Sequence, residues 1–238
     1  MDLAILRGWR PIGVDLREGD IIANLSQPQG REHLICEATR LSGGKLDAVI
    51  ACAGVSIGQP ALAIPVNFFG AVATLHGLRP LLAKGDQPRA VAVSSWAASQ
   101  PYDESLVEAC LQGDEGKVLQ MVAGSTDLGL LYGASKAALS RWVRRNAITH
   151  PWAGSGILLN AIAPGFVRTP MVATISEDPV ARANLEQYMP MPIGRDALPG
   201  EMAELLLWLA STANSMIVGQ VIYADGGAEA AVRGDARF

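Results

Sequence analysis

The chain has 238 residues, half of them hydrophobic and 18% charged, a composition that suits one globular domain with a large buried core. The formal net charge of −4 is mild and the sequence holds no run of Lys and Arg, so nucleic acid is not an expected partner. No apolar stretch approaches the ~20 residues of a membrane span, and residues 1–10 lack the pattern of a secretory signal, so we expect a cytoplasmic protein with no membrane contact.

Short apolar runs alternate with longer amphipathic segments, the pattern of βαβ units around a parallel sheet. The predicted strands lie at residues 10–16, 46–51, 89–94, 157–162 and 220–223. The predicted helices lie at 27–41, 66–83, 132–149, 171–188 and 200–210, and the polar stretch 100–129 is expected to be an insertion with helices at 104–111 and 116–122. We therefore predict one α/β domain over residues 1–238, a Rossmann-like doubly wound parallel sheet with helices on both faces.

A tyrosine and a lysine four residues apart, Tyr132 and Lys136, give the first chemical signal. On a helix this spacing places the phenol and the ammonium on one face. A nearby ammonium stabilises phenolate, so the phenol could exchange a proton with a substrate oxygen near neutral pH. The pair alone is weak support, because Tyr and Lys one turn apart occur by chance on many surface helices.

Three polar residues stand at the ends of predicted elements. Ser95 follows the strand at 89–94, at the sheet edge where ligands bind, and its hydroxyl could bond a substrate carbonyl or simply form a turn. Asn67 opens the helix at 66–83, where it could equally satisfy backbone donors of the helix start. Asp15 ends the strand at 10–16, where a carboxylate can accept hydrogen bonds from ribose hydroxyls or form an ordinary turn.

Together these residues occur in the order and secondary-structure context of one enzyme family. The motifs are Cys52-Ala53-Gly54, Asn67, Ser94-Ser95, Tyr132-x-x-x-Lys136 and Ala163-Pro164-Gly165. Over residues 9–227 the chain resembles the short-chain dehydrogenase/reductase family. It resembles in particular the bacterial 3α-hydroxysteroid dehydrogenase/carbonyl reductase branch, through the strand Ile12-Gly13-Val14-Asp15-Leu16-Arg17, the long insertion before Tyr132 and the ending Tyr223-Ala224-Asp225-Gly226-Gly227.

The resemblance implies roles for four residues. Tyr132 is the expected general acid/base, and Ser95 is expected to orient the substrate oxygen. Lys136 would lower the pKa of Tyr132 and bind the nicotinamide ribose, while Asn67 would hold a water that links Lys136 to solvent. The implied reaction is hydride transfer between a nicotinamide cofactor and a secondary alcohol or ketone, for example a steroid or an aromatic alcohol.

The resemblance also implies the cofactor and its contacts. NAD is expected rather than NADP, because the carboxylate of Asp15 would repel a 2′-phosphate, although Arg17 is a cation two residues later. The other expected contacts are Asn24 and Leu25 at the adenine, Ala53 and Gly54 at the ribose and diphosphate, Lys136 at the nicotinamide ribose, and Pro164, Gly165, Val167 and Thr169 around the nicotinamide. Asn24 stands where many relatives have Asp.

One family motif has no match in this sequence: a first strand that runs into the turn T-G-x-x-x-G-I-G, whose glycines let the cofactor diphosphate approach the backbone. Residues 1–8 resemble the last turns of the helix after that turn. The missing strand is normally central, so its loss is expected to open two sheet edges. Three explanations stand: a chain given in shortened form, a non-catalytic dehydrogenase-like scaffold that no longer binds dinucleotide, and an enzyme that completes the site by other means.

Further expectations concern the substrate pocket, the assembly and metals. An apolar lid over the substrate is expected, with plain helix packing as the alternative, and its residues are Met171, Val172, Ile175, Tyr188, Met189 and Met191.

Relatives are mostly dimers or tetramers. Apolar surface for a homodimer or homotetramer is expected from Leu139, Trp142, Val143 and Ile148. The scattered cysteines and histidines predict neither a metal site nor a disulfide.

Overall fold

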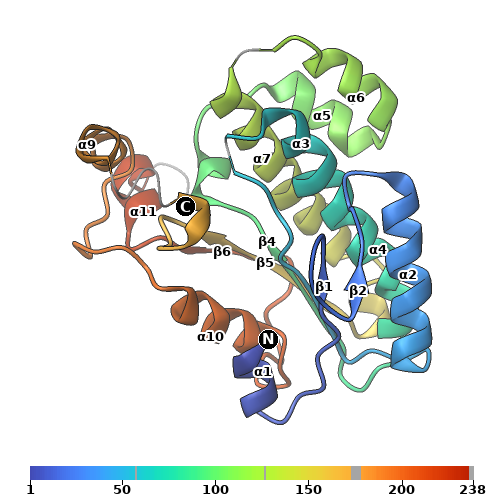
Figure 1. Ribbon diagram of the computed structural model, residues 1–238. Helices are drawn as coiled ribbons and strands as arrows, with labels where there is room; N and C mark the ends of the chain where they lie inside the picture. The colour runs from blue at the N-terminus through green and yellow to red at the C-terminus, as the bar shows by residue number, and fades with distance from the viewer. Residues whose placement is uncertain (57, 126, 173–177, 236–238) are drawn as a thin grey trace.

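A parallel four-stranded sheet lies at the centre of the computed structural model, which describes residues 1–56, 58–125, 127–172 and 178–235 (Figure 1). Its order is β3-β4-β5-β6, with β3 at Ala48–Ala51, β4 at Arg89–Val93, β5 at Leu158–Pro164 and β6 at Val221–Ala224. Most residues of β4 and β5 are buried, as expected of strands covered on both faces. Four of the five predicted strands are confirmed.

Helices cover both faces of this sheet, which confirms the doubly wound α/β fold. On one face lie α2 (Pro28–Ser42), α4 (Ala71–Leu82) and α7 (Leu128–Ala147), and on the other lie α10 (Pro199–Leu209) and the short α1 (Asp2–Leu6) (Figure 1). Residues 1–8 were expected to be helical, and α1 confirms this. Proline opens both α2 and α10, where its missing N–H costs nothing.

The amino-terminal strand prediction needs correction. The strand expected at 10–16 is only Val14–Asp15 (β1), and it pairs in parallel with Ile21–Ile22 (β2), a strand that the sequence analysis left unassigned. Among the described residues these two strands form a sheet of their own, separate from β3. A strand extends only as far as a neighbour accepts its hydrogen bonds, and β1 has one short neighbour. In the described part of the chain β1 and β3, the two strands whose edges were expected to be open, do not pair with each other.

The helix expected at 66–83 starts earlier and changes type. It runs from α3 (Pro60–Ile64) through a π-helical turn, η1 (Pro65–Gly70), into α4. The stretch Ala61–Leu82, with a mean hydropathy of 1.5, is long and apolar enough to cross a membrane, which corrects the expectation that no stretch approaches that length. More than half of its most apolar window is buried inside the fold. The core helix of a soluble domain has the same composition, and the cytoplasmic location stays a prediction.

Two helices are observed in the insertion, α5 at Glu104–Gln112 and α6 at Glu115–Val122. An aspartate caps the start of each of α5, α6 and α7: Asp103, Asp114 and Asp127 accept hydrogen bonds from backbone N–H groups of the first turn. Helix α7 therefore begins four residues before the predicted start.

The helix predicted at 171–188 is interrupted. Its described parts are a 3₁₀ turn, η4 (Pro170–Val172), and α9 (Pro179–Tyr188), and residues 173–177, with Ile175, lie outside the described residues. Asp178 caps α9 through the N–H groups of Val180 and Ala181. A proline after a capping aspartate is a strong start signal, so α9 begins as a separate helix. The chain ends in a further short helix, α11 (Ala228–Arg233).

Candidate active site

Ser95 and the Tyr-Lys pair meet beside the carboxyl end of β4. Ser95 is the second residue after that strand and caps a 3₁₀ turn, η2 (Trp96–Ser99), by accepting a hydrogen bond from the N–H of Ala97 at 3.2 Å. Tyr132 and Lys136 lie one turn apart on α7, and the ammonium is 5.9 Å from the centre of the phenol ring. The neighbouring Ser94 is committed to packing, because its hydroxyl donates to the carbonyl of Lys136 at 3.1 Å.

The phenol of Tyr132 is held next to the serine hydroxyl. Burial raises the pKa of Tyr132, and a hydrogen bond with the Ser95 side chain works in the opposite direction. A group that must give up and regain a proton is thus placed beside a hydroxyl that can share the same substrate oxygen. Ser95 and Tyr132 thus lie together, but the expected lowering of the Tyr132 pKa by Lys136 is not observed, because burial raises that pKa.

Lys136 is buried, with 4% of its surface exposed. Its ammonium donates to the carbonyl of Val93 at 2.9 Å, and among the described residues no carboxylate forms an ion pair with it. Burial lowers the pKa of Lys136 to about 8. An ammonium has three N–H donors, so this one retains donors for the hydroxyls of a bound ligand.

Asn67 lies in the π-helical turn η1 and is fully buried. Its amide oxygen accepts from the N–H of Val55 at 2.8 Å, and its amide nitrogen donates to the Val55 carbonyl at 3.2 Å and to the Ser135 hydroxyl at 3.3 Å. Asn67 therefore does not cap a helix start, one of the two readings left open by the sequence. Instead it ties the loop after β3 to α7. π-helical turns occur frequently at functional sites.

Gly54 lies within this arrangement. A Cβ at Gly54 would come within 3.2 Å of the Asn67 amide oxygen and 3.6 Å of the Lys136 ammonium. The absence of a side chain keeps the surface beside Lys136 open. The preceding residue, Ala53, is exposed, so both expected contacts of this loop are accessible to a ligand.

Asp15 lies at the end of β1 with its side chain exposed. Its carboxylate accepts from the N–H of Arg17 at 2.8 Å, and this backbone hydrogen bond is the main reason that the pKa of Asp15 is lowered. The group is ionised near neutral pH and can accept hydrogen bonds from ribose hydroxyls. The same bond also suits the ordinary turn role considered from the sequence.

Asn24 and Leu25 form the loop before α2. The Asn24 side chain accepts from both the N–H and the hydroxyl of Ser26, at 3.0 and 2.7 Å, and so braces the loop. Leu25 packs against η1, since a Cβ at Gly70 would come within 3.1 Å of its Cβ. Of this pair, Asn24 is exposed and Leu25 is half-buried.

The four residues expected around the nicotinamide lie at and after the end of β5. Pro164 ends the strand, and Gly165 packs so closely on the chain after β6 that a Cβ would lie 2.8 Å from the Cα of Asp225. Val167 forms a parallel bridge with Ala197, and Thr169 is half-buried.

An apolar cluster lies next to Ser95 and includes the following residue, Trp96. Its buried members are Trp96, Phe166, Met189 and Ala228, and Val172, Leu185, Met191 and Tyr223 pack against it. The rings of Trp96 and Tyr188 meet edge to face at 5.3 Å. Val172, Tyr188, Met189 and Met191 thus lie where the lid was expected, whereas the side chain of Met171 lies outside the described residues. Sequence reasoning missed Trp96 and Phe166, although each directly follows a predicted site residue.

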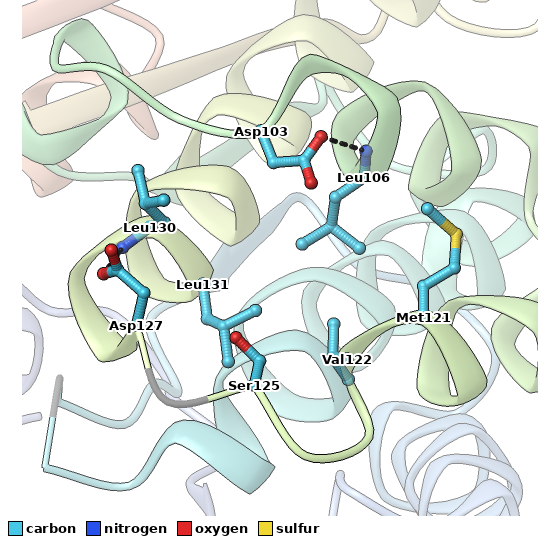
Figure 2. A pocket seen from close by; sticks show the side chains of 8 residues that line it. All are labelled: Asp103, Leu106, Met121, Val122, Ser125, Asp127, Leu130 and Leu131. Atoms are coloured by element: carbon cyan, nitrogen blue, oxygen red, sulfur yellow. Dashed lines mark hydrogen bonds between the residues drawn. The ribbon is translucent and has the colours of Figure 1, made fainter.

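A separate small cavity of about 110 Å³ lies within the insertion and is lined by residues of α5, α6 and α7 (Figure 2). It is mostly apolar, and the carboxylate of Asp103 at its rim is already used to cap α5 through Leu106. This cavity reflects packing between helices and adds no reactive group.

Comparison with known proteins decides the family. A family model described as enoyl-(acyl carrier protein) reductase matches residues 118–229. The 3-alpha-hydroxysteroid dehydrogenase/carbonyl reductase of Comamonas testosteroni is 35% identical over 232 residues, which cover 95% of this chain and 89% of that protein. The chain belongs to the short-chain dehydrogenase/reductase family.

Solved structures of short-chain dehydrogenases/reductases agree with this assignment. The crystal structure of the 3-alpha-hydroxysteroid dehydrogenase from Pseudomonas sp. B-0831 complexed with NADH has a TM-score of 0.92 and 37% identity, covering all of this chain and 93% of that one. The aldohexose dehydrogenase of Thermoplasma acidophilum, with 21% identity and a TM-score of 0.72, shares the fold alone. As a member of this family, the protein is an oxidoreductase that acts between a nicotinamide cofactor and an alcohol or ketone.

The site of this family member offers contacts for both riboses of a nicotinamide dinucleotide, but not the family's turn for the diphosphate. Lys136 has ammonium donors to spare, and Gly54 leaves the space beside them open, which suits a ribose. Asp15 provides an acceptor for the second ribose. For the diphosphate between them, the sequence contains no T-G-x-x-x-G-I-G turn, and Ala53 and Gly54 are the expected contacts that the structure describes there.

Proposed function

We propose that the protein oxidises secondary alcohols of medium size, or reduces the matching ketones, with NAD as the cofactor and a hydroxysteroid or aromatic alcohol as the substrate. The observation that carries this proposal is the meeting of Ser95, Tyr132 and the buried Lys136 at the end of β4. The Comamonas relative, named a hydroxysteroid dehydrogenase and carbonyl reductase, supports the substrate class.

Tyr132 is the proton donor and acceptor in the proposed mechanism. In the direction of reduction it gives its phenolic proton to the alkoxide that forms on the substrate, and in oxidation it takes that proton back. The Ser95 hydroxyl donates a hydrogen bond to the same oxygen and so orients the carbonyl. The bound nicotinamide supplies or accepts the hydride.

Lys136 and Asn67 support this proton transfer. The ammonium of Lys136 stabilises the phenolate electrostatically and donates to the hydroxyls of the nicotinamide ribose. Asn67, which already links Val55 to Ser135, is assigned the part of holding a water that connects Lys136 to solvent. These side chains return the phenol to its starting state after each turnover.

The apolar cluster around Trp96 and Phe166 supports a substrate of medium size. It lies directly after Ser95 on one side and Gly165 on the other, so a hydrophobic ring system bound at Ser95 has apolar surface to contact. The cluster includes the lid residues Met189 and Met191, and flexible methionines suit ligands of varied shape.

Asp15 supports NAD over NADP, because its ionised carboxylate would face the 2′-phosphate of NADP. The test is a titration of each cofactor into the 238-residue chain, followed by thermal unfolding and nicotinamide fluorescence. NAD is expected to stabilise the wild-type protein more than NADP, and Asp15→Asn is expected to reduce that difference. Lack of stabilisation by either cofactor would favour the non-catalytic scaffold.

We also propose a homodimer or homotetramer, but not for the reason given by the sequence pattern. Leu139, Trp142 and Val143 are buried in the protein's own core and offer no surface to a partner, whereas Ile148 is 74% exposed. The relatives' tendency to associate is the remaining support. Light scattering at micromolar concentration tests the proposal, and a monomeric mass would overturn it.

A further inference from the structure

Arg31 is a buried charged residue with no assigned part in the reaction, and its side chain is only 10% exposed. It lies in the first turn of α2, and its guanidinium forms a two-pronged ion pair with Glu115 of the insertion, at 2.6 and 2.8 Å. Burying an arginine is costly unless its N–H donors are satisfied. The groups that accept its remaining donors therefore show which parts of the chain Arg31 holds in place.

Those remaining donors hold two backbone segments together. The Nε of Arg31 donates to the carbonyl of Leu25 at 2.7 Å, and Nη2 donates to the carbonyl of Pro65 at 3.0 Å. Leu25 belongs to the loop before α2, and Pro65 begins the π-helical turn η1. One planar cation therefore bonds both segments, close to where Leu25 packs on Gly70.

Each of the two segments leads to the proposed cofactor site. The loop of Asn24 and Leu25 is the expected adenine contact, and η1 carries Asn67 two residues after Pro65. Asn67 in turn fixes the backbone of Val55, next to Gly54. A shift of Arg31 would thus be transmitted to both ends of the cofactor.

We propose that Arg31, fixed by Glu115, is a positioning residue that sets the spacing between the adenosine-side loop and the π-helical turn. The insertion then has a role in cofactor binding through α6, in addition to any role as a wall of the substrate pocket. This inference rests on the proposed function, because it concerns the affinity for NAD.

The test compares Arg31→Lys and Glu115→Gln with the wild-type protein. Lysine keeps the charge but cannot bond both carbonyls and the carboxylate in one plane. Glu115→Gln leaves both carbonyls in place and removes only the charge that fixes Arg31, so it covers the case in which Arg31→Lys does not fold. The readouts are the KM for NAD, the KM for the alcohol, and the dissociation constant of AMP by titration calorimetry.

Both variants are expected to raise the KM for NAD and the dissociation constant of AMP about ten-fold, with little change in the KM for the alcohol. Arg141→Lys is the matched control, because Arg141 also ties the insertion to the core, through Glu104 and through Tyr102 at 2.8 Å, but contacts neither segment. It is expected to lower thermal stability and leave the AMP affinity unchanged.

Two results would overturn the inference. One is an unchanged AMP affinity in both Arg31→Lys and Glu115→Gln. The other is an equal loss of AMP affinity in Arg141→Lys, which would show that any weakening of the insertion has this effect. A wild-type protein that binds neither AMP nor NAD would instead overturn the proposed function, and this inference with it.

Discussion

The two sides of the proposed cofactor site differ in how they are built. The side with Tyr132, Lys136 and Asn67 is anchored on the four-stranded sheet and on the long helix α7, and Lys136 and Asn67 are almost or fully buried. The side with Asp15 and Asn24 rests on a ladder of two residue pairs, and both side chains are exposed. In the proposed mechanism the proton-transfer groups are thus supported by the core, whereas the proposed adenosine contacts depend on local turns and on Arg31.

This difference has a physical origin. Buried polar groups are strongly constrained, because each unpaired donor or acceptor costs about 1–3 kcal/mol. The side chain of an exposed turn residue such as Asn24 can bond water instead of protein, so its substitution costs less free energy of folding. Substitutions on the buried side should therefore change turnover or stability, whereas substitutions on the exposed side should mainly change cofactor preference.

The largest effect is expected for Tyr132→Phe, which removes the proposed proton donor and keeps the ring. Turnover should fall about 10³-fold, because a positioned acid/base contributes on the order of 10²–10⁴. The fold should be retained, since no described backbone depends on the phenol oxygen. Steady-state rates and thermal unfolding measure both properties, and Tyr102→Phe in the insertion is the control. Turnover within a few-fold of wild type would exclude Tyr132 from the chemistry.

A loss of stability is expected for Asn67→Ala. The change leaves the N–H of Val55 without its partner and opens a cavity, so the free energy of unfolding should fall by about 3 kcal/mol. Asn24→Ala on the exposed side should cost about 1 kcal/mol, because it removes two hydrogen bonds to Ser26 but opens no cavity in the core. Urea unfolding of the two variants measures the difference, and equal losses would contradict the contrast between the two sides.

The burial of Lys136 predicts a dependence of stability on pH. Its folded pKa of about 8 is below its usual 10.5, so above pH 8 the unfolded chain binds more protons than the folded one. Lys136 should therefore contribute a rise of about 2 kcal/mol in the free energy of unfolding between pH 8 and 10, whereas below pH 8 the penalty of burying the ammonium is fully present.

Lys136→Met should abolish that rise, and the exposed Lys84→Met should keep it. The raised pKa values of Cys52, Cys110 and Tyr132 act with the opposite sign as the pH rises through their usual values, so the measured quantity is the difference between the wild-type and Lys136→Met profiles up to pH 10. The same profile in the wild-type protein and in Lys136→Met would show that Lys136 is not buried as a cation.

Asp15→Asn should have the smallest effect. The side chain is exposed, so the thermal stability should stay close to that of the wild-type protein. The ratio of the KM values for NADP and NAD should fall about ten-fold, because the charge that opposes a 2′-phosphate is removed. An unchanged ratio would assign Asp15 to the turn alone.

The sequence predicted those parts of the molecule that depend on local patterns. Continuous apolar runs located β3 to β6, and the four-residue spacing placed Tyr132 and Lys136 on one face of α7. The order of motifs then indicated the family. Polar composition with helical spacing was enough to locate α5 and α6.

Features that depend on tertiary contacts escaped sequence reasoning. The shortening of β1 follows from which strands lie beside it, and the contact of Gly70 in η1 with Leu25 joins segments far apart in the sequence. Helical periodicity alone could not show that Trp142 faces the core rather than a partner. The bonds of Arg31 join residues that lie far apart in the sequence, and no local pattern marks them.

The central claim is that this chain carries out hydride transfer on a secondary alcohol. The most direct test is to mix the purified 238-residue protein with NAD and a 3α-hydroxysteroid, an aryl alcohol or a control without alcohol, and to follow nicotinamide absorbance. The account predicts that NADH appears with at least one alcohol, faster than NADPH appears with NADP. A folded protein that forms neither reduced cofactor with any of the alcohols would contradict it.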